Sequence, residues 1–147
     1  MDILETLHRE HQAVRKLLKQ MVETEDSKLR TALFSEFRVA MVKHARAEER
    51  ALYEPLGQAN GRETEIEAKE GYIEHTLLDT LIEQLKRARN KATTDWSARI
   101  KVLNELLEHH IQEEEREFFP SARAHFSTAE REQMNASFES IKRKVKT

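Results

Sequence analysis

The sequence contains no cysteine, and only three glycines and two prolines among 147 residues. Without cysteine the chain has no disulfide framework, no iron–sulfur cluster, no thiolate zinc site and no thiol nucleophile. The scarcity of glycine and proline, together with 35% charged residues, leaves little room for the turns of a β-sheet. This composition favours long helices with solvated faces.

Long apolar runs and an excess of basic charge are also missing. No apolar stretch approaches the roughly 18 residues of a membrane span, and Met1–Glu5 has no basic region ahead of an apolar stretch, as a secretory signal would. We therefore expect a cytoplasmic protein without a membrane partner. The formal net charge of −2 is unlike that of a general nucleic-acid binder, so no nucleic-acid partner is expected. The length suits one domain, which we expect to span residues 1–147.

Apolar residues recur at helical spacing along nearly the whole chain and predict four long helices followed by a shorter one. Short connections between the long helices favour an all-α fold, an up-down-up-down antiparallel four-helix bundle over about residues 2–120. A capping box, Ser127-x-x-Glu130, predicts an additional short C-terminal helix over about residues 127–145, which packs on the bundle. The first helix is predicted to start at Asp2 and to end before Asp26–Ser27, where the second begins. The second ends near Pro55–Gly57, and the third runs from Asn60–Gly61 to Asn90. The fourth runs from Thr93–Asp95 to Pro120.

One arrangement of histidine and glutamate occurs twice. A single histidine, His11 or His75, is followed in each half by a histidine and a glutamate one helical turn apart. In antiparallel helices, residues equally far from the intervening turn lie at one level, and the four histidines satisfy this condition to within about 3 Å. We therefore expect them to meet in one layer in the middle of the bundle, together with both glutamates. The six residues are His11, His44, Glu48, His75, His110 and Glu114.

This layer has the chemistry of a metal site. Two ionised glutamates are costly to bury close together without a counter-charge, and a divalent or trivalent cation supplies one. Mixed imidazole and carboxylate ligands suit iron best, with manganese or zinc as alternatives. Two carboxylates able to bridge and four imidazoles suggest two ions. A ferritin-like site is disfavoured, because it needs Glu-x-x-His on two helices and only Glu5–His8 has that form.

The pattern resembles the hemerythrin-like family, also called the HHE cation-binding domain. The resemblance covers residues 1–120 and rests on Glu10–His11, Glu74–His75 and the two His-x-x-x-Glu-Glu motifs, each of which leads into an aromatic–proline segment. Membership implies a non-haem di-iron centre, two iron ions with an oxo or hydroxo bridge. It also implies that the four histidines are terminal ligands and that Glu48 and Glu114 bridge the two ions.

One position departs from the oxygen carriers of that family. Those proteins resemble this pattern but have a further histidine one turn after the histidine of the third helix, where this chain has Asp79. Reversible O₂ carriage is therefore less expected. Asp79 is interpreted as a surface acid, with replacement of the missing ligand as the alternative. His8 is interpreted as a partly exposed histidine, with a ligand or a hydrogen-bond donor near the site as alternatives.

Five other residues lie at or beyond the ends of this pattern: Gly71, Tyr53, His109, Phe119 and His125. Gly71 lies one turn before His75 and either leaves space for a small ligand beside the metal or permits close helix packing. Tyr53 and Phe119 are expected to pack at the end of the core. His109 and His125 are not expected to be ligands, because the first points away from His110 and the second follows the fourth helix.

The expected function is a di-iron protein that binds or reacts with O₂, NO or peroxide at an open iron position. Peroxide decomposition or NO handling fits the altered ligand set better than O₂ storage, so the partner is a diatomic or peroxide ligand. The alternatives are a non-catalytic oxygen, redox or iron sensor, an iron-handling module and a reversible O₂ carrier. Neither a protein partner nor an electron donor is indicated by the sequence.

Overall fold

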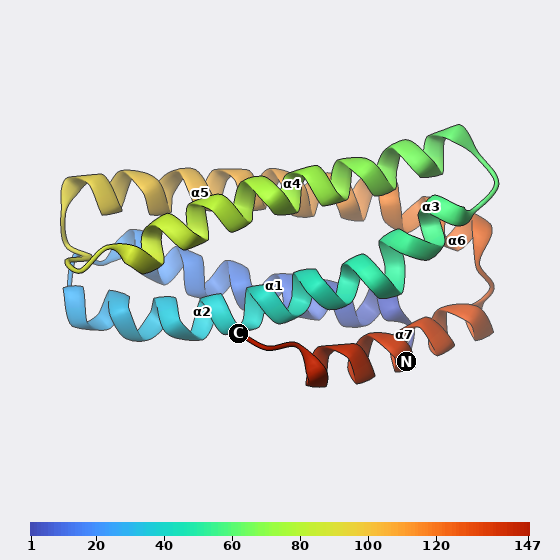
Figure 1. Cartoon of the computed structure of the whole chain (residues 1–147), viewed down its shortest axis with the longest axis horizontal. Helices are drawn as coiled ribbons and strands as arrows, with labels where there is room; N and C mark the ends of the chain where they lie inside the picture. Colours follow the sequence, from blue (N-terminus) through green and yellow to red (C-terminus); the bar gives the residue numbers. More distant parts are fainter.

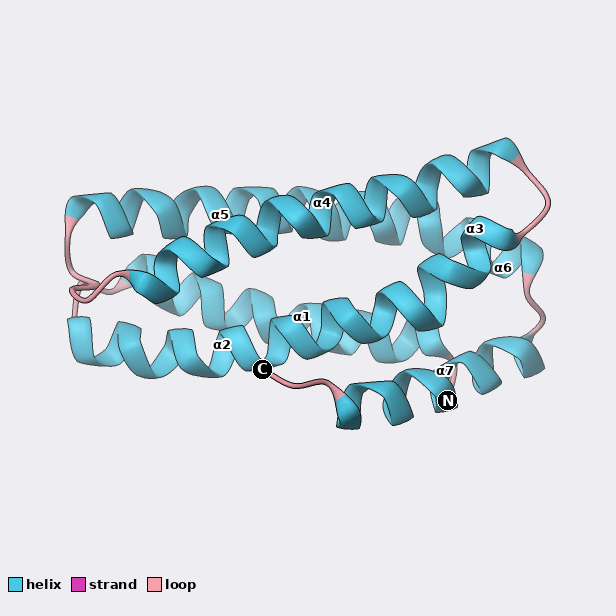
Figure 2. Ribbon diagram, in the orientation of Figure 1, coloured by secondary structure: helices cyan, strands magenta, loops and turns pink.

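The computed structural model describes residues 1–147 and consists of helices and loops (Figure 1, Figure 2). Two of the long helices pass through a short π-helical segment (η) and continue as a short α-helix. The elements in order are α1 (Ile3–Glu23), α2 (Ser27–Glu48), η1 (Glu49–Tyr53), α3 (Glu54–Gln58), α4 (Arg62–Arg87), α5 (Thr94–Glu113), η2 (Glu114–Phe118), α6 (Phe119–His125) and α7 (Thr128–Lys144).

Side chains at the predicted positions cap most of the helices. Asp2 and Asp26 accept hydrogen bonds from the backbone N–H groups of Leu4 and Leu29, and Thr93 does the same for Trp96. At α7 the capping box is complete, since the Ser127 and Glu130 side chains each accept from the other residue's backbone N–H. Each cap satisfies a backbone donor that has no partner within its helix.

The long helices form two antiparallel hairpins that pack side by side. Figure 1 shows the α1–α2 and α4–α5 turns at one end of the molecule and the α3–α4 connection at the other. α1 contacts α2 and α5, α4 contacts α5, and α7 lies against α1 and α2. The predicted all-α bundle with an added C-terminal helix is confirmed. No helix has the length and apolarity that crossing a membrane requires.

The π-helical segments were not predicted, and they explain why Pro120 does not end its helix. Each segment lies just before a proline, Pro55 or Pro120. In η2 the N–H of Phe119 reaches the carbonyl of Glu114, five residues back. This wider turn relieves the clash between a proline ring and the preceding turn. The prediction that the fourth helix ends at Pro120 is therefore wrong, and the chain stays helical to His125.

The apolar core is divided into two clusters. One fills the end of the bundle that contains the α1–α2 and α4–α5 turns, and the other fills the end covered by α3, α6 and α7. Along α1 the division falls between Leu7 and Val14, and along α5 and η2 it falls between Ile111 and Phe118. The polar layer occupies the space between the two clusters, so apolar side chains exclude water from it on both sides.

A buried arginine joins the two hairpin turns at the first of these ends. Arg30, 2% exposed, donates to the carbonyl oxygens of Met21 (3.1 Å) and Lys91 (2.7 Å) and to Ser97 Oγ (2.8 Å). Its guanidinium also lies 5.1 Å from the centroid of the Trp96 ring. A carbonyl group in the last turn of α1 and one in the α4–α5 turn thereby obtain donors that the helices do not supply.

We expect Arg30→Met to lower the free energy of unfolding by about 2–4 kcal/mol, because buried acceptors lose their donor. Chemical denaturation of the metal-free protein measures this value. Lys69→Ala is the control. Lys69 is exposed and forms a single weak i,i+4 ion pair, with its Nζ 4.0 Å from Glu65 Oε1, so its effect on the free energy of unfolding should stay within about 0.5 kcal/mol. Equal effects of the two substitutions would contradict the role given to Arg30.

Candidate metal centre

The six predicted residues lie together in the layer between the two apolar clusters. Each is at most 2% exposed. The His11 and His44 rings are 5.1 Å apart between centroids, and the His75 and His110 rings are 5.0 Å apart. α1 and α2 contribute the first pair, and α4 and α5 the second. Their ligand atoms form two adjacent groups, His11–His44–Glu48–Glu114 and Glu48–His75–His110, in which all atoms lie within 4.8 Å of one another.

The two glutamates connect these groups. Glu48 Oε1 is 3.6 Å from His44 Nε2 and 3.2 Å from His75 Nε2. Glu114 instead uses both of its oxygens, with Oε1 3.1 Å from His11 Nε2 and Oε2 3.4 Å from His110 Nε2. Each carboxylate therefore spans both histidine pairs, which is the arrangement required of a ligand shared by two cations.

A carboxylate also orients each of the four histidines from its other side. Every Nδ1 lies 2.7–2.9 Å from a glutamate oxygen, so an Nδ1–H donor directs the Nε2 lone pair toward the layer. These glutamates are sequence neighbours of the predicted ligands but come from other helices. The pairs are His11–Glu115, His44–Glu10, His75–Glu49 and His110–Glu74.

The pairs obey an approximate two-fold symmetry between the hairpins. Glu10 on α1 orients His44 of its own hairpin, as Glu74 on α4 orients His110. Glu49 and Glu115 act across the hairpins, on His75 and His11. The sequence placed these four acids next to ligands. It did not indicate which histidine each acid contacts, because those contacts depend on how the helices are rotated in the bundle.

Several polar atoms that face the layer have no hydrogen-bond partner. They are His11 Nε2, His44 Nε2, both carboxylate oxygens of Glu48 and Glu114 Oε1. So many unpaired polar atoms in one buried layer raise the free energy of the folded state unless a cation occupies the space between them. The donor set, imidazole nitrogens and carboxylate oxygens, therefore fits one or more transition-metal ions.

The protonation of the layer shows how strongly it attracts positive charge. Burial opposes protonation of His44, but the charge of Glu48 and the hydrogen bond to Glu10 outweigh it and raise the His44 pKa to about 10. Against the same effect of burial, the close contact with the Glu48 carboxylate and the hydrogen bond to Glu49 raise the His75 pKa to about 9. Protons on these histidines thus balance the glutamates until a metal cation displaces them.

Tyr53, which the sequence predicted only to pack at the end of the core, contributes a phenol to the layer. Its Oη donates a short hydrogen bond to Glu114 Oε2 and lies 3.4 Å from both His75 Nε2 and His110 Nε2. Burial and the charge of Glu114 raise the Tyr53 pKa well above its usual value, so the phenol stays protonated. The corresponding residue of the second half is Phe119, whose ring stacks on His11. The two halves therefore differ at this point.

Tyr53 also explains Gly71. A Cβ added at Gly71 would lie 2.5 Å from Cε2 and Cζ of the Tyr53 ring. The space that glycine leaves is therefore filled by the tyrosine, which favours the close-packing interpretation over space for a ligand. The aromatic spacing in the sequence offered a signal for a packed ring, but nothing in it showed that the hydroxyl reaches the metal layer.

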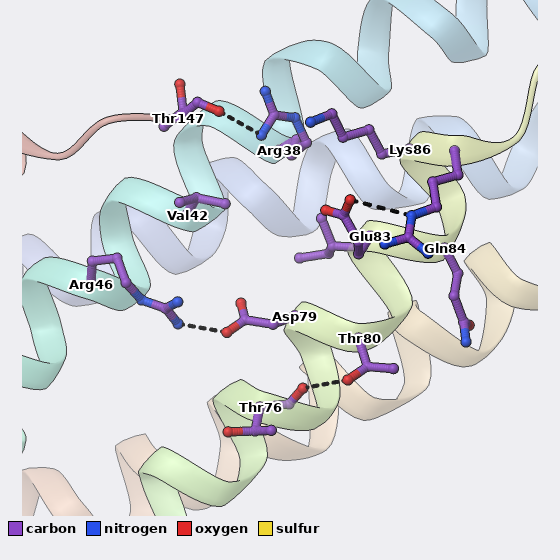
Figure 3. A pocket seen from close by; sticks show the side chains of 12 residues that line it. Arg38, Val42, Arg46, Thr76, Asp79, Thr80, Glu83, Gln84, Lys86 and Thr147 are labelled. Atoms are coloured by element: carbon purple, nitrogen blue, oxygen red, sulfur yellow. Dashed lines mark hydrogen bonds and ion pairs between the residues drawn. The ribbon is translucent and has the colours of Figure 1, made fainter.

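The remaining candidates lie outside the layer. His8 is half exposed, and its Nδ1 lies 3.0 Å from both oxygens of Glu115. Asp79 forms an ion pair with Arg46 at 2.8 Å on the rim of a surface cleft, as Figure 3 shows. His109 is exposed beside Glu113, and His125 bonds to the carbonyl of Ser121. Among these polar residues, the six buried ones form the layer and Tyr53 adds its hydroxyl to it.

A four-helix bundle with a buried histidine–carboxylate layer defines a metal-binding helical protein. The chain belongs to the hemerythrin HHE cation-binding domain family, whose model matches residues 2–122. The crystal structure of an HHE cation-binding domain-containing protein, the Rv2633c homologue from Mycobacterium kansasii, has the same fold. It has a TM-score of 0.77 and 24% identity, and the match covers 98% of this chain and 89% of that chain.

A curated relative, a DNA nickase from the Nostoc strain PCC 7120, is 26% identical over 145 residues. This match covers 99% of the present chain but only 40% of the nickase. The chain therefore corresponds to less than half of that longer protein.

We expect Gly71→Ala to destabilise the protein, because the new methyl group meets an aromatic ring in a filled core. Overpacking costs about 1–3 kcal/mol, which exceeds the gain of about 1 kcal/mol from alanine in a helix. Gly61→Ala is the control, since its added Cβ meets only Thr64 Oγ1 at an ordinary 3.5 Å. Thermal unfolding of both metal-free variants measures the difference, and an unchanged or raised Tm for Gly71→Ala would refute the packing role.

Proposed function

We propose that the protein is a non-haem di-iron protein that binds or reacts with O₂, NO or peroxide. His11 and His44 would hold one iron and His75 and His110 the other, and Glu48 and Glu114, which contact both histidine pairs, could serve both. The observation that carries this proposal is that both carboxylates span both histidine pairs within one water-poor layer. Iron bound there supplies redox chemistry and an open coordination position.

The residues of the chain would control that chemistry in three ways. The four oriented histidines remain neutral ligands through their Nδ1–H donors. The apolar clusters on either side keep bulk water away and strengthen each electrostatic contact. The phenol of Tyr53 presents a protonated donor beside His75 and His110, where an oxygen atom of a small ligand would gain a hydrogen bond.

A small ligand has a short route to this layer. A cleft of about 390 Å³ is lined by His8, Glu115 and Phe119, among others. Glu115 and Phe119 both contact His11. One layer of side chains, those of Glu115 and Phe119, therefore separates the cleft from His11. Movement of these side chains would admit a diatomic molecule or peroxide more readily than a large organic substrate.

Peroxide decomposition or NO handling is preferred to O₂ storage. No fifth histidine contributes to the layer, and Asp79, at the corresponding position, is paired with Arg46. Conversion of peroxide to water and dioxygen needs no further reductant, because peroxide is both oxidised and reduced. The nicking activity in the name of the Nostoc relative finds no support in the charge of this chain, which is −2 overall.

Metal analysis and spectroscopy of the protein as expressed test this function. We expect two irons per chain and a visible ligand-to-metal band that changes on addition of peroxide or NO, because both ligands enter the coordination sphere. One zinc per chain and a featureless spectrum would overturn the proposal. An iron-loaded protein that neither consumes nor binds peroxide or NO would favour a sensor or an iron-handling module instead.

The ligand assignment is tested by substitution. We expect His110→Ala and Glu114→Ala to lose metal, because each removes a donor atom from a buried site that has none to spare. His109→Ala and His125→Ala are matched controls, since both histidines lie on α5 or α6 but point away from the layer. Metal content is measured after dialysis against a weak chelator. Full metal content in both ligand variants would contradict the assignment.

A further inference from the structure

A chain of hydrogen bonds leads from the surface cleft between α2 and α4 to one of the histidines. Arg46 Nη2 lies 2.8 Å from Asp79 Oδ2 and 3.0 Å from Glu49 Oε2. The same oxygen of Glu49 lies 2.7 Å from His75 Nδ1. Exposure falls along this chain, since the side chains of Arg46 and Asp79 are 37% and 38% exposed, that of Glu49 is 18% exposed and that of His75 is 1% exposed.

The four residues form two neighbouring cross-links between α4 and the stretch where α2 passes into η1. Asp79 follows His75 by one turn on α4, and Glu49 follows Arg46 by about one turn at the α2–η1 boundary. The two cross-links, Arg46–Asp79 and Glu49–His75, thus join the same helical stretches at successive levels. Figure 3 shows the outer one, with the Arg46 side chain reaching across the cleft to Asp79.

The other half of the molecule lacks this arrangement. Glu115, the counterpart of Glu49, has the partly exposed His8 as its second partner instead of an arginine. A cross-helix ion pair does occur there, between Arg15 and Glu108, at 2.5 and 3.0 Å. However, neither of its members bonds to an acid that orients a histidine. Glu10, which orients His44, also has a basic partner, Lys142 of α7. What is specific to His75 is that the basic residue bound to its orienting acid is itself held by a second acid, Asp79.

We propose that Arg46 and Asp79 are positioning residues for the metal site of His75 and His110. This inference rests on the metal-binding function proposed above. Arg46 fixes the Glu49 carboxylate, Glu49 fixes the ring of His75, and Asp79 holds the long arginine side chain in the one orientation that reaches Glu49. The clamp, meaning Arg46 with Asp79, thus stabilises metal at one of the two sites and leaves the other unaffected.

The physical basis is the flexibility of the residues involved. A free arginine side chain loses conformational entropy when it is held in one orientation, and the ion pair with Asp79 holds it there before metal binds. Two acids hold Arg46 at once, since its Nη2 lies 2.8 Å from Asp79 Oδ2 and 3.0 Å from Glu49 Oε2. Partners of this kind that orient ligand histidines typically change metal affinity by about 10- to 100-fold.

Cobalt(II) is the probe of choice, because its visible spectrum reports the ligand geometry and it needs no redox partner. We expect Arg46→Gln to release one of its two cobalt ions to a chelator about 10- to 100-fold faster than the original protein. The second ion should leave at an unchanged rate. Arg15→Gln is the matched control, since it breaks the equivalent ion pair of the other half and should leave both rates unchanged.

Further variants separate positioning from a general loss of stability. Arg46→Lys should restore part of the slow release, and Asp79→Asn should show a smaller effect than Arg46→Gln. Glu49→Gln should release the same ion, and adding Arg46→Gln to it should change little, because the arginine acts through Glu49. In a His110→Ala background, which lacks the affected site, Arg46→Gln should have no effect on the remaining ion.

Three results would overturn the proposal. They are equal release rates for Arg46→Gln and Arg15→Gln, additive effects of Arg46→Gln and Glu49→Gln, and binding of no more than one cobalt ion by the unaltered protein. A different result would overturn the proposed di-iron function while leaving the role of Arg46 and Asp79 intact. A protein that binds two cobalt ions and shows the expected release pattern, but does not react with peroxide or NO when loaded with iron, retains the clamp and loses the proposed reactivity.

Discussion

The structure depends on satisfying both nitrogens of four buried imidazoles at once. Each Nδ1 has a glutamate partner, and each Nε2 faces the space shared with Glu48 and Glu114. A buried polar group without a partner costs more free energy than most single contacts return. The layer is therefore tolerable only when all its glutamates are in place and a cation, either protons or metal, balances their charge.

Much of the surrounding architecture serves this requirement. The apolar core is divided so that a polar layer fits between its two parts. The π-helical segments begin at or directly after the shared glutamates, and each accommodates a proline one turn or so later. π-helical turns are rare and tend to occur at functional sites. Here they lead from the metal layer to Tyr53 in one half and to Phe118 and Phe119 in the other.

The fold and the six-residue layer could be predicted because they follow from spacing along single helices. Helix caps such as Ser127 and the equal distances of the histidines from their turns are local properties of the sequence. The prediction that Pro120 ends a helix was wrong because a π turn depends on packing that no local rule describes. The position of the Tyr53 phenol and the ion pair of Asp79 with Arg46 could not be predicted from the sequence for the same reason. Each depends on which faces of separate helices meet.

The hydrogen bonds that cross between the hairpins have a mechanical consequence. Glu49 orients His75 and Glu115 orients His11, so neither hairpin contains a complete site. Metal bound in the layer would tie together segments as far apart in the chain as His11 and Glu114, and closing such long loops removes disorder from the unfolded state. A chain without cysteine would thereby obtain a reversible cross-link. Its rigidity would depend on the availability of metal, whereas that of a disulfide-linked protein depends on oxidising conditions.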